Sequence, residues 1–181
     1  MADKMKFNPF PEIKSNRLFL RNIKESDCES ILFLRSDKTV NKFIERPENR
    51  KTKNKSDAVK FIKEINEATE NDTSISWGIT LKTNPQIIGT ICLWNFSENN
   101  KTAEVGYDLK LEFQGNGIMS EALNCIINFG FNELKLDKIE AFTHTKNENS
   151  KKLLEKCEFL LNEDRKDKEN DSNVIFELKR L

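Results

Sequence analysis

The chain has 181 residues, a length that fits one domain over residues 1–181 with a core large enough to fold without disulfides or a structural metal. Its 30 basic and 30 acidic residues cancel to a net charge of zero, which argues against a general nucleic-acid-binding protein with a basic face. The longest apolar runs are too short to span a membrane. The N-terminal residues lack the apolar core of a secretory signal, so we expect a cytoplasmic protein without membrane or nucleic-acid partners.

The four cysteines, Cys28, Cys92, Cys125 and Cys157, lack the CxxC spacing of metal and redox sites. With a single histidine in the chain, they do not form the ligand set of a metal cluster, and we expect no metal site. We interpret the cysteines as reduced, mostly buried residues of a cytosolic protein.

The N-terminal part is expected to form one strand and two helices. Alternating side chains over residues 16–21 predict the strand. Helical spacing over residues 26–35 predicts a short helix with Ser26 as its N-cap. Residues 37–54 have weak periodicity and are predicted to form a loop with room for one helical turn. A second helix is predicted over residues 56–71, where apolar residues again recur at helical spacing.

The middle of the chain is expected to form an antiparallel meander. Apolar runs over residues 74–81 and 86–94 predict two strands, joined by a turn through Asn84 and Pro85. A third strand is predicted over residues 102–109. Short links between consecutive strands favour antiparallel pairing.

A glycine-bearing loop leads from the third strand into an amphipathic helix whose apolar face runs from Met119 to Leu134. The start of this helix would present unpaired backbone N–H groups and about half a positive charge, which together bind phosphate or pyrophosphate. Glycine also lets a ligand approach the backbone closely. The loop residues that would present these groups are Gln114, Gly115, Asn116 and Gly117.

Residues 138–145 are predicted to form a strand after this helix. The helix would then be the crossover of a βαβ unit, which implies that the strands on either side of it are parallel. A last helix is predicted over residues 149–157. Residues 159–161 and 173–178 should close the chain as a hairpin with an exposed, charged loop.

This order of elements, with four sequence motifs, resembles the GCN5-related N-acetyltransferase (GNAT) family, and more closely its ribosomal-protein branch of the RimJ/RimL type. The motifs are residues 16–21, 103–107, 114–122 and 147–159, and the resemblance spans about residues 15–180. The family's loop reads Gln/Arg-x-x-Gly-x-Gly/Ala, with Met119 at the final small position here. The resemblance implies an α/β (α+β) fold with a mixed, mostly antiparallel twisted sheet of about seven strands and about four flanking helices.

The resemblance also implies acetyl-CoA as co-substrate. In the family the pantetheine arm lies where the strand before the loop and the strand after the long helix splay apart. Asn147 matches a family asparagine that hydrogen-bonds the CoA arm, and helix N-capping is its alternative role. Glu158 stands where the family usually has glycine, so the end of the last helix is expected to be distorted. The pyrophosphate would lie on the loop backbone of Gln114, Gly115, Asn116, Gly117, Ile118 and Met119.

Acetyl transfer from an activated thioester needs a neutral amine rather than a nucleophilic side chain. At pH 7 an α-amino group is about one-tenth neutral, whereas a lysine is about one part in two thousand neutral. Glu104, in the strand before the loop, is the leading candidate for the base, and a solvated strand residue is the alternative. Ser150 matches a serine proposed in this branch to act near the thiol leaving group, and helix capping is the alternative. Many relatives use a tyrosine of the last helix as the acid, but Tyr107 is the only tyrosine here.

The remaining candidate residues have less specific roles. We interpret His144 as a packed or edge residue of its strand, and Trp77 and Trp94 as core residues of theirs. Phe43 and Ile44 are expected to line the acceptor pocket, because the family's substrate-binding wall usually comes from this region.

The preferred function is transfer of acetyl from acetyl-CoA to an amine in a ternary complex, with a protein N-terminus of the ribosomal-protein-alanine type as the acceptor. A small amine such as an aminoglycoside, polyamine or amino acid is the first alternative, which acids at Asp37, Glu45 and Glu48 keep open. A non-catalytic acyl-CoA sensor is the second. A mononucleotide-binding protein is a weaker third, since the glycines lack the Lys-Ser/Thr pair of a P-loop. The oligomeric state is expected to be a monomer or a homodimer.

Overall fold

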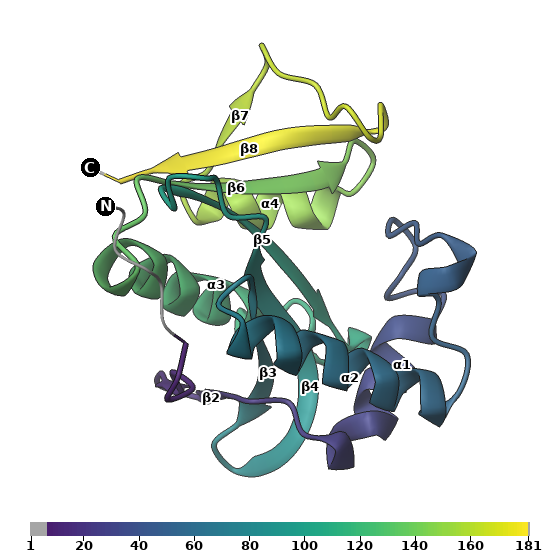
Figure 1. Cartoon of the computed structure of the whole chain (residues 1–181). Helices are drawn as coiled ribbons and strands as arrows, with labels where there is room; N and C mark the ends of the chain where they lie inside the picture. Colours follow the sequence, from purple (N-terminus) through teal and green to yellow (C-terminus); the bar gives the residue numbers. More distant parts are fainter. Residues whose placement is uncertain (1–6, 181) are drawn as a thin grey trace.

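An eight-stranded twisted sheet runs through the molecule in the strand order β1-β2-β3-β4-β5-β6-β8-β7 (Figure 1). The computed structural model describes residues 7–180. Among the described strands β5 and β6 are the parallel pair, and the other neighbours are antiparallel. The expected mixed, mostly antiparallel sheet is therefore confirmed, with the short β1 as an addition. The strands are β1 (Ile13–Lys14), β2 (Leu18–Arg21), β3 (Ile75–Leu81), β4 (Asn84–Trp94), β5 (Thr102–Leu109), β6 (Lys138–His144), β7 (Leu160–Asn162) and β8 (Asn173–Lys179).

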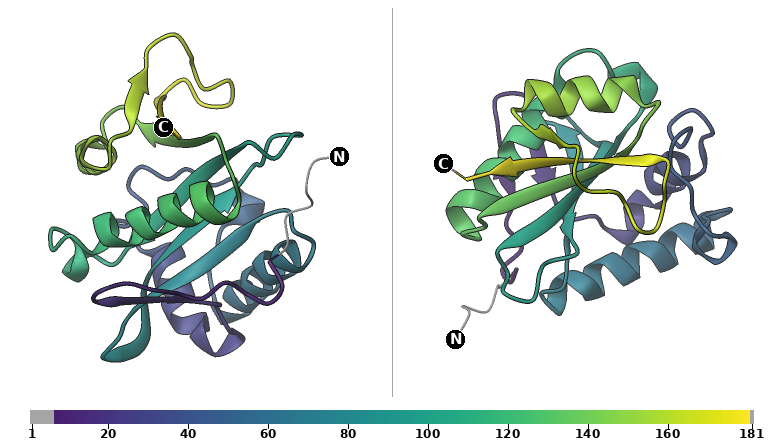
Figure 2. Two further views of the ribbon diagram at one scale, coloured as in Figure 1. Left: turned by 90° about the vertical axis from the view of Figure 1, so that its left-hand side faces the viewer. Right: turned by 90° about the horizontal axis from the view of Figure 1, so that it is seen from above.

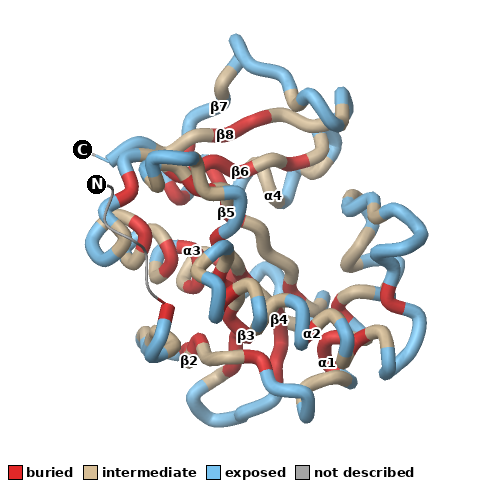
Figure 3. Tube along the Cα trace, in the orientation of Figure 1, coloured by how far each residue is buried: buried red, intermediate tan, exposed pale blue. Residues whose placement is uncertain are grey.

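Helices cover both faces of this sheet (Figure 2). α1 (Cys28–Ser36) and α2 (Lys55–Glu70) pack on one face, in a cluster that includes Ile87 of β4. α3 (Ile118–Asn128) and α4 (Glu148–Lys156) lie on the other face, in the larger core. A π-helical turn, Phe129–Glu133, extends α3 almost to its predicted end. The buried residues follow the strands and the helix sides that face them (Figure 3).

The starts of α1 and α2 differ from the prediction. Ser26 does not cap α1, because it lies inside a 3₁₀ turn, Glu25–Asp27, that precedes the helix. The backbone N–H of Lys24 donates to the Asp27 carboxylate at 2.8 Å across this turn. α2 begins one residue earlier than predicted and is capped by Asn54, whose side-chain oxygen accepts from the helix backbone. Between the two helices the chain is irregular, with one 3₁₀ turn, Glu48–Arg50, as expected.

The β3–β4 turn also lies elsewhere than predicted. Asn84 pairs with Leu81, so Asn84 and Pro85 already belong to β4 and the turn consists of Lys82 and Thr83. A proline is tolerated here because it stands near the beginning of the strand.

The two tryptophans have different environments. Trp77 is fully buried, and its indole N–H donates to the carbonyl of Pro11 at 2.7 Å, which confirms its prediction as a core residue. The same prediction for Trp94 is wrong, because its side chain is 45% exposed. Trp94 is the last residue of β4 and lines the cleft described below.

The cysteines are less buried than expected. All four thiols are free, but Cys157 is buried whereas Cys28, Cys92 and Cys125 are half-buried. Within residues 7–180, no three His, Cys, Asp or Glu side chains are grouped so that they could hold a metal ion. In the same part of the chain, the helices are too short or too polar to cross a bilayer.

The parallel pair β5–β6 is the feature that creates the site. As predicted, α3 is the crossover between these strands. Their pairing covers three positions, from Thr102 opposite Lys138 to Glu104 opposite Glu140. Beyond this point β5 and β6 separate, while β6 stays paired with β8, which lies along its other edge over the whole strand. The backbone edge of β5 after Glu104 is therefore left without a strand partner on this side.

The end of α4 keeps a regular capping geometry despite the glutamate. The N–H of Phe159 donates to the carbonyl of Leu154, and the N–H of Glu158 donates to that of Glu155, each at 3.0 Å. These are the two bonds of a Schellman motif, and Phe159 and Leu154 supply its buried apolar contact. The prediction of a distorted helix end is therefore wrong. Instead, Glu158 itself adopts the left-handed conformation, with φ of 67°.

Because a side chain in the left-handed region is strained by about 1 kcal/mol, we expect Glu158→Gly to raise the free energy of unfolding by about that amount. In a chain of this size the melting temperature should rise by about 2–4 °C, measured by calorimetry or circular dichroism. Glu158→Ala is the matched control, since it removes the carboxylate but keeps the Cβ atom. Equal melting temperatures for the two variants would contradict this explanation.

Candidate active site

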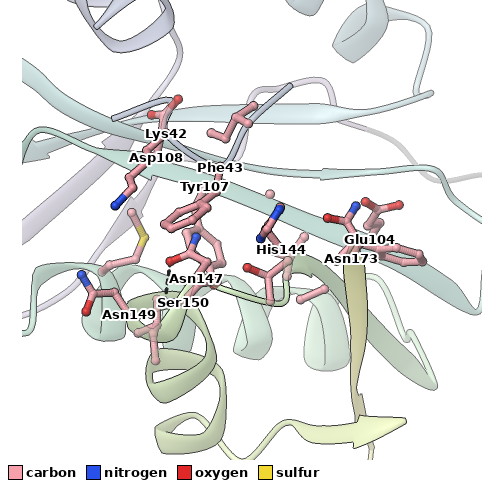
Figure 4. Close-up of a pocket in the computed structure, with 18 of the residues that line it drawn as sticks. Lys42, Phe43, Glu104, Tyr107, Asp108, His144, Asn147, Asn149, Ser150 and Asn173 are labelled. Carbon is pink, nitrogen blue, oxygen red and sulfur yellow. Dashed lines mark hydrogen bonds between the residues drawn. The ribbon is translucent and has the colours of Figure 1, made fainter. Parts of the chain in front are cut away.

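A cleft of about 1980 Å³ opens where β5 and β6 separate. Because the neighbouring strand is absent here, side chains from both faces of β5 reach it. Tyr107 comes from the α3–α4 face of the sheet, whereas Glu104 and Asp108 come from the opposite face. Figure 4 shows Tyr107 beside Ser150 and Asn147 of the α4 start, with Glu104 farther along β5.

The glycine loop lies at the end of the cleft where β5 runs into α3. Gly115 and Gly117 have positive φ angles, 76° and 73°, and Gly117 is the N-cap of α3. Within the described chain, the backbone N–H groups of residues 115–120 donate no hydrogen bond to protein. No atom lies within 4 Å of the position of a Cβ on Gly115, so this part of the loop is open. These features fit a phosphate group held by main-chain donors.

The predicted loop side chains lie in different surroundings. Those of Ile118 and Met119 are mostly buried in the core, so these two residues offer a ligand mainly their backbone. The Gln114 side chain donates to the carbonyl of Leu109 at 2.9 Å and thereby ties the loop to the end of β5. Asn116 does not line the cleft, whereas the other predicted loop residues do.

A polar clamp that the sequence analysis missed holds the loop from outside. Arg17 donates to the carbonyl of Asn116 at 2.9 Å and to the carboxylate of Glu121 at 2.7 Å. The Ser15 hydroxyl donates to the same carboxylate at 2.6 Å. The turn between β1 and β2 is thus fixed to the first turn of α3. Glu121 belongs to the loop motif, but only the fold brings Arg17 to it.

Glu104 stands at the last paired position of β5, at the mouth of the opening. Asn95 donates to its carboxylate at 3.3 Å. Burial raises the pKa of Glu104 to about 7, the carboxylates of Asp167, Glu140 and Glu169 add to this, and the Asn95 hydrogen bond opposes it. A carboxyl group with this pKa is suited to take a proton near neutral pH.

Ser150 and Tyr107 form a hydroxyl pair that sequence reasoning did not find. Their oxygens are 2.8 Å apart in a hydrogen bond. Burial raises the pKa of Tyr107 to about 12, although the bond to Ser150 opposes this shift, so the phenol stays protonated. A tyrosine in the last helix is absent, as noted from the sequence, but the strand residue Tyr107 brings a phenol to the start of that helix.

Asn147 has the capping role that was its alternative reading. Its side-chain oxygen accepts from the backbone N–H of Ser150 at 3.2 Å. Both residues also line the cleft, so the capping bonds leave their place in the site unchanged. Contact of Asn147 or Ser150 with a CoA arm stays a prediction.

The segment of residues 39–47, between α1 and α2, forms another wall of the cleft. Phe43 packs against the His144 ring at the end of β6, with ring centres 5.3 Å apart. Phe43 and Ile44 line the cleft, as their predicted role in an acceptor pocket requires. Of the three acids that kept a small amine acceptor open, only Glu45 lines the cleft. Asp37 instead accepts from two backbone N–H groups of its own turn, and Glu48 pairs with lysines outside the cleft.

The sequence model described as an acetyltransferase (GNAT) domain matches residues 17–160. The uncharacterized N-acetyltransferase YoaA of Bacillus subtilis is 31% identical over 152 residues, which cover 83% of each chain. The structure of a ribosomal-protein-S5-alanine acetyltransferase from Vibrio fischeri superposes with a TM-score of 0.79 at 22% identity, over 93% of this chain and 96% of that one. RimL, a ribosomal L7/L12 alpha-N-protein acetyltransferase solved with coenzyme A, has a TM-score of 0.79 at 18% identity, over 93% of this chain and 98% of its own.

Proposed function

Because the chain belongs to the GNAT family and is an acetyl-CoA-dependent N-acetyltransferase, we propose that its acceptor is the free α-amino group of a protein N-terminus. The observation that carries the site assignment is the row of unpaired backbone N–H groups over residues 115–120, directly beside the open edge of β5. These donors would hold the pyrophosphate of acetyl-CoA. The pantetheine arm would follow the β5 edge, with the thioester between Glu104 and the Tyr107–Ser150 pair.

The reaction is direct attack of the amine on the thioester carbon. The new N–C bond forms as the C–S bond breaks, and the amine gives one proton to Glu104, directly or through a water molecule. The Tyr107–Ser150 pair donates a hydrogen bond to the sulfur that leaves. A thiol with a pKa near 8.5 needs little help from an acid, so the hydroxyl pair mainly orients the thioester.

The proton balance favours an α-amine over a lysine. An α-amino group with a pKa near 8 lies only about one unit above the value of about 7 for Glu104. A lysine near 10.4 would give up its proton to the same carboxylate far less readily. The relatives' names support the same choice, since the structural neighbours are named for an alanine of a ribosomal protein and for alpha-N acetylation. A ribosomal acceptor would be met in the cytoplasm.

The charge of the cleft argues against polycationic acceptors. Among the described residues that line it, acidic and basic side chains are equal in number, seven of each. Lys42 and Arg46 of the 39–47 segment outnumber its single acid, Glu45. A polyamine or aminoglycoside, which carries several positive charges, would gain little net attraction here.

An acceptor screen with acetyl-CoA tests this function. Peptides beginning with Ala, Ser or Met should be acetylated on the α-amine with kcat/KM at least tenfold above that for spermidine, an aminoglycoside or free amino acids, because the site has no excess negative charge. Product mass spectrometry after blocking lysines locates the acetyl group. A higher kcat/KM for a polycation would overturn the acceptor assignment, and acetyl-CoA binding without turnover of any amine would indicate a sensor.

Glu104→Gln tests the base, because glutamine cannot take up the proton. We expect kcat to fall about a hundredfold, at the low end for general bases since the α-amine is already partly neutral. In the wild type kcat/KM should rise with pH as Glu104 ionises near 7 and the peptide's amine loses its proton near 8, and level off above both values. In the variant, kcat/KM should rise with pH only as the peptide's amine, with a pKa near 8, loses its proton. Glu98→Gln, an exposed glutamate outside the cleft, is the control. An unchanged profile in Glu104→Gln would show that the base lies elsewhere.

A further inference from the structure

One part of the sheet face beside the 39–47 segment carries no helix. Trp94 of β4 lies directly opposite Glu104 of β5, and Cys92 lies opposite Gly106. The intervening residues of these strands, such as Leu93, are buried on the α3 face. Trp94 and Glu104 therefore project side by side on the sheet face opposite α3, since directly opposed side chains have Cβ atoms about 5 Å apart.

Gly106 leaves space for the indole to extend across the strand. A Cβ at this position would lie 3.8 Å from the indole nitrogen of Trp94 and 3.3 Å from the Cys92 sulfur. The indole therefore reaches from β4 over the backbone of β5. On the β4 side, the Glu104 carboxyl is therefore bordered by an aromatic ring and, at Gly106, by main chain without a side chain.

The exposure of this tryptophan needs an explanation. Trp94 is 45% exposed and Ile44 of the 39–47 segment is 37% exposed, and both line the cleft. Within residues 7–180 the indole N–H of Trp94 has no hydrogen-bond partner, whereas that of Trp77 has one. An exposed aromatic ring next to a carboxyl group, with an exposed aliphatic side chain on another wall of the same cleft, matches a ligand that is cationic at one end and apolar beside it.

We propose that Trp94, Ile44 and the backbone of Gly106 form the subsite for the side chain of the acceptor's first residue, and that this side chain is apolar. The α-amine is held at Glu104, and the first side chain packs on the indole. While still protonated, the amine is also attracted by the ring face. The inference rests on the proposed function, because it assumes a peptide N-terminus as the acceptor.

Fluorescence quenching measures this contact without turnover. The chain has two tryptophans, and only Trp94 is accessible to a quencher because Trp77 is 0% exposed. With CoA present, a saturating peptide that begins with Met should lower the acrylamide quenching constant at least twofold. The same peptide beginning with Asp should leave it unchanged at equal concentration. Bound Met peptide that leaves the quenching unchanged would overturn the proposal.

Kinetics of Trp94→Ala measure its contribution to specificity. We expect kcat/KM to fall at least tenfold for peptides that begin with Met or Leu, mainly through KM, and less than threefold for the same peptide beginning with Ala. Trp94→Phe should restore most of the loss. Phe33→Ala is the matched control, because Phe33 is similarly exposed, at 43%, but does not line the cleft. Unchanged acetyl-CoA binding, measured by calorimetry, verifies that each variant is folded.

The outcomes separate this inference from the proposed function. If the wild type acetylates no peptide, the proposed function fails. If it acetylates peptides but Trp94→Ala lowers kcat/KM equally for every first residue, or for none, the subsite assignment fails while the function stands.

Discussion

The site depends on one constraint in the sheet, the separation of two parallel strands after three paired positions. β5 and β6 are joined through α3, and β6 diverges from β5 after Glu140 while it stays paired with β8 along its other edge. An interior strand therefore exposes backbone that a regular sheet would pair, and side chains from both of its faces meet one cleft. The proposed placement of one thioester between Glu104 and the Tyr107–Ser150 pair requires that no strand stands between them.

The two ends of this cleft present different chemical groups, main-chain donors at one end and side chains at the other. At one end the main chain supplies the donors, since the side chains of Ile118 and Met119 are buried in the core. The backbone that carries these donors is held from outside the loop, because Arg17 donates hydrogen bonds to the carbonyl of Asn116 and to the carboxylate of Glu121. At the other end side chains determine the chemistry, where burial and nearby carboxylates raise the pKa of Glu104 to about 7. In the proposed site, the backbone would thus recognise a phosphate, and a carboxyl group with a raised pKa would recognise an amine.

The sequence was sufficient where local patterns determine structure. Periodicity predicted the meander, the crossover helix and the final hairpin, and the spacing of Gly115 and Gly117 predicted the loop. It failed where distant segments decide the outcome. Trp94 was assigned to the core from its strand, yet its burial depends on whether a helix covers the end of β4. The Tyr107–Ser150 hydrogen bond joins residues 43 positions apart, so no local sequence pattern predicts it. Glu158 was misread because the Schellman bonds hold its backbone in a conformation that glycine would adopt more readily.

A crystal structure with coenzyme A bound tests the central claim most directly. We predict the pyrophosphate within hydrogen-bonding distance of the backbone N–H groups of residues 115–120, the pantetheine arm along the open edge of β5, and the sulfur near the Ser150 hydroxyl. Coenzyme A bound elsewhere, with the strand opening empty, would contradict the account.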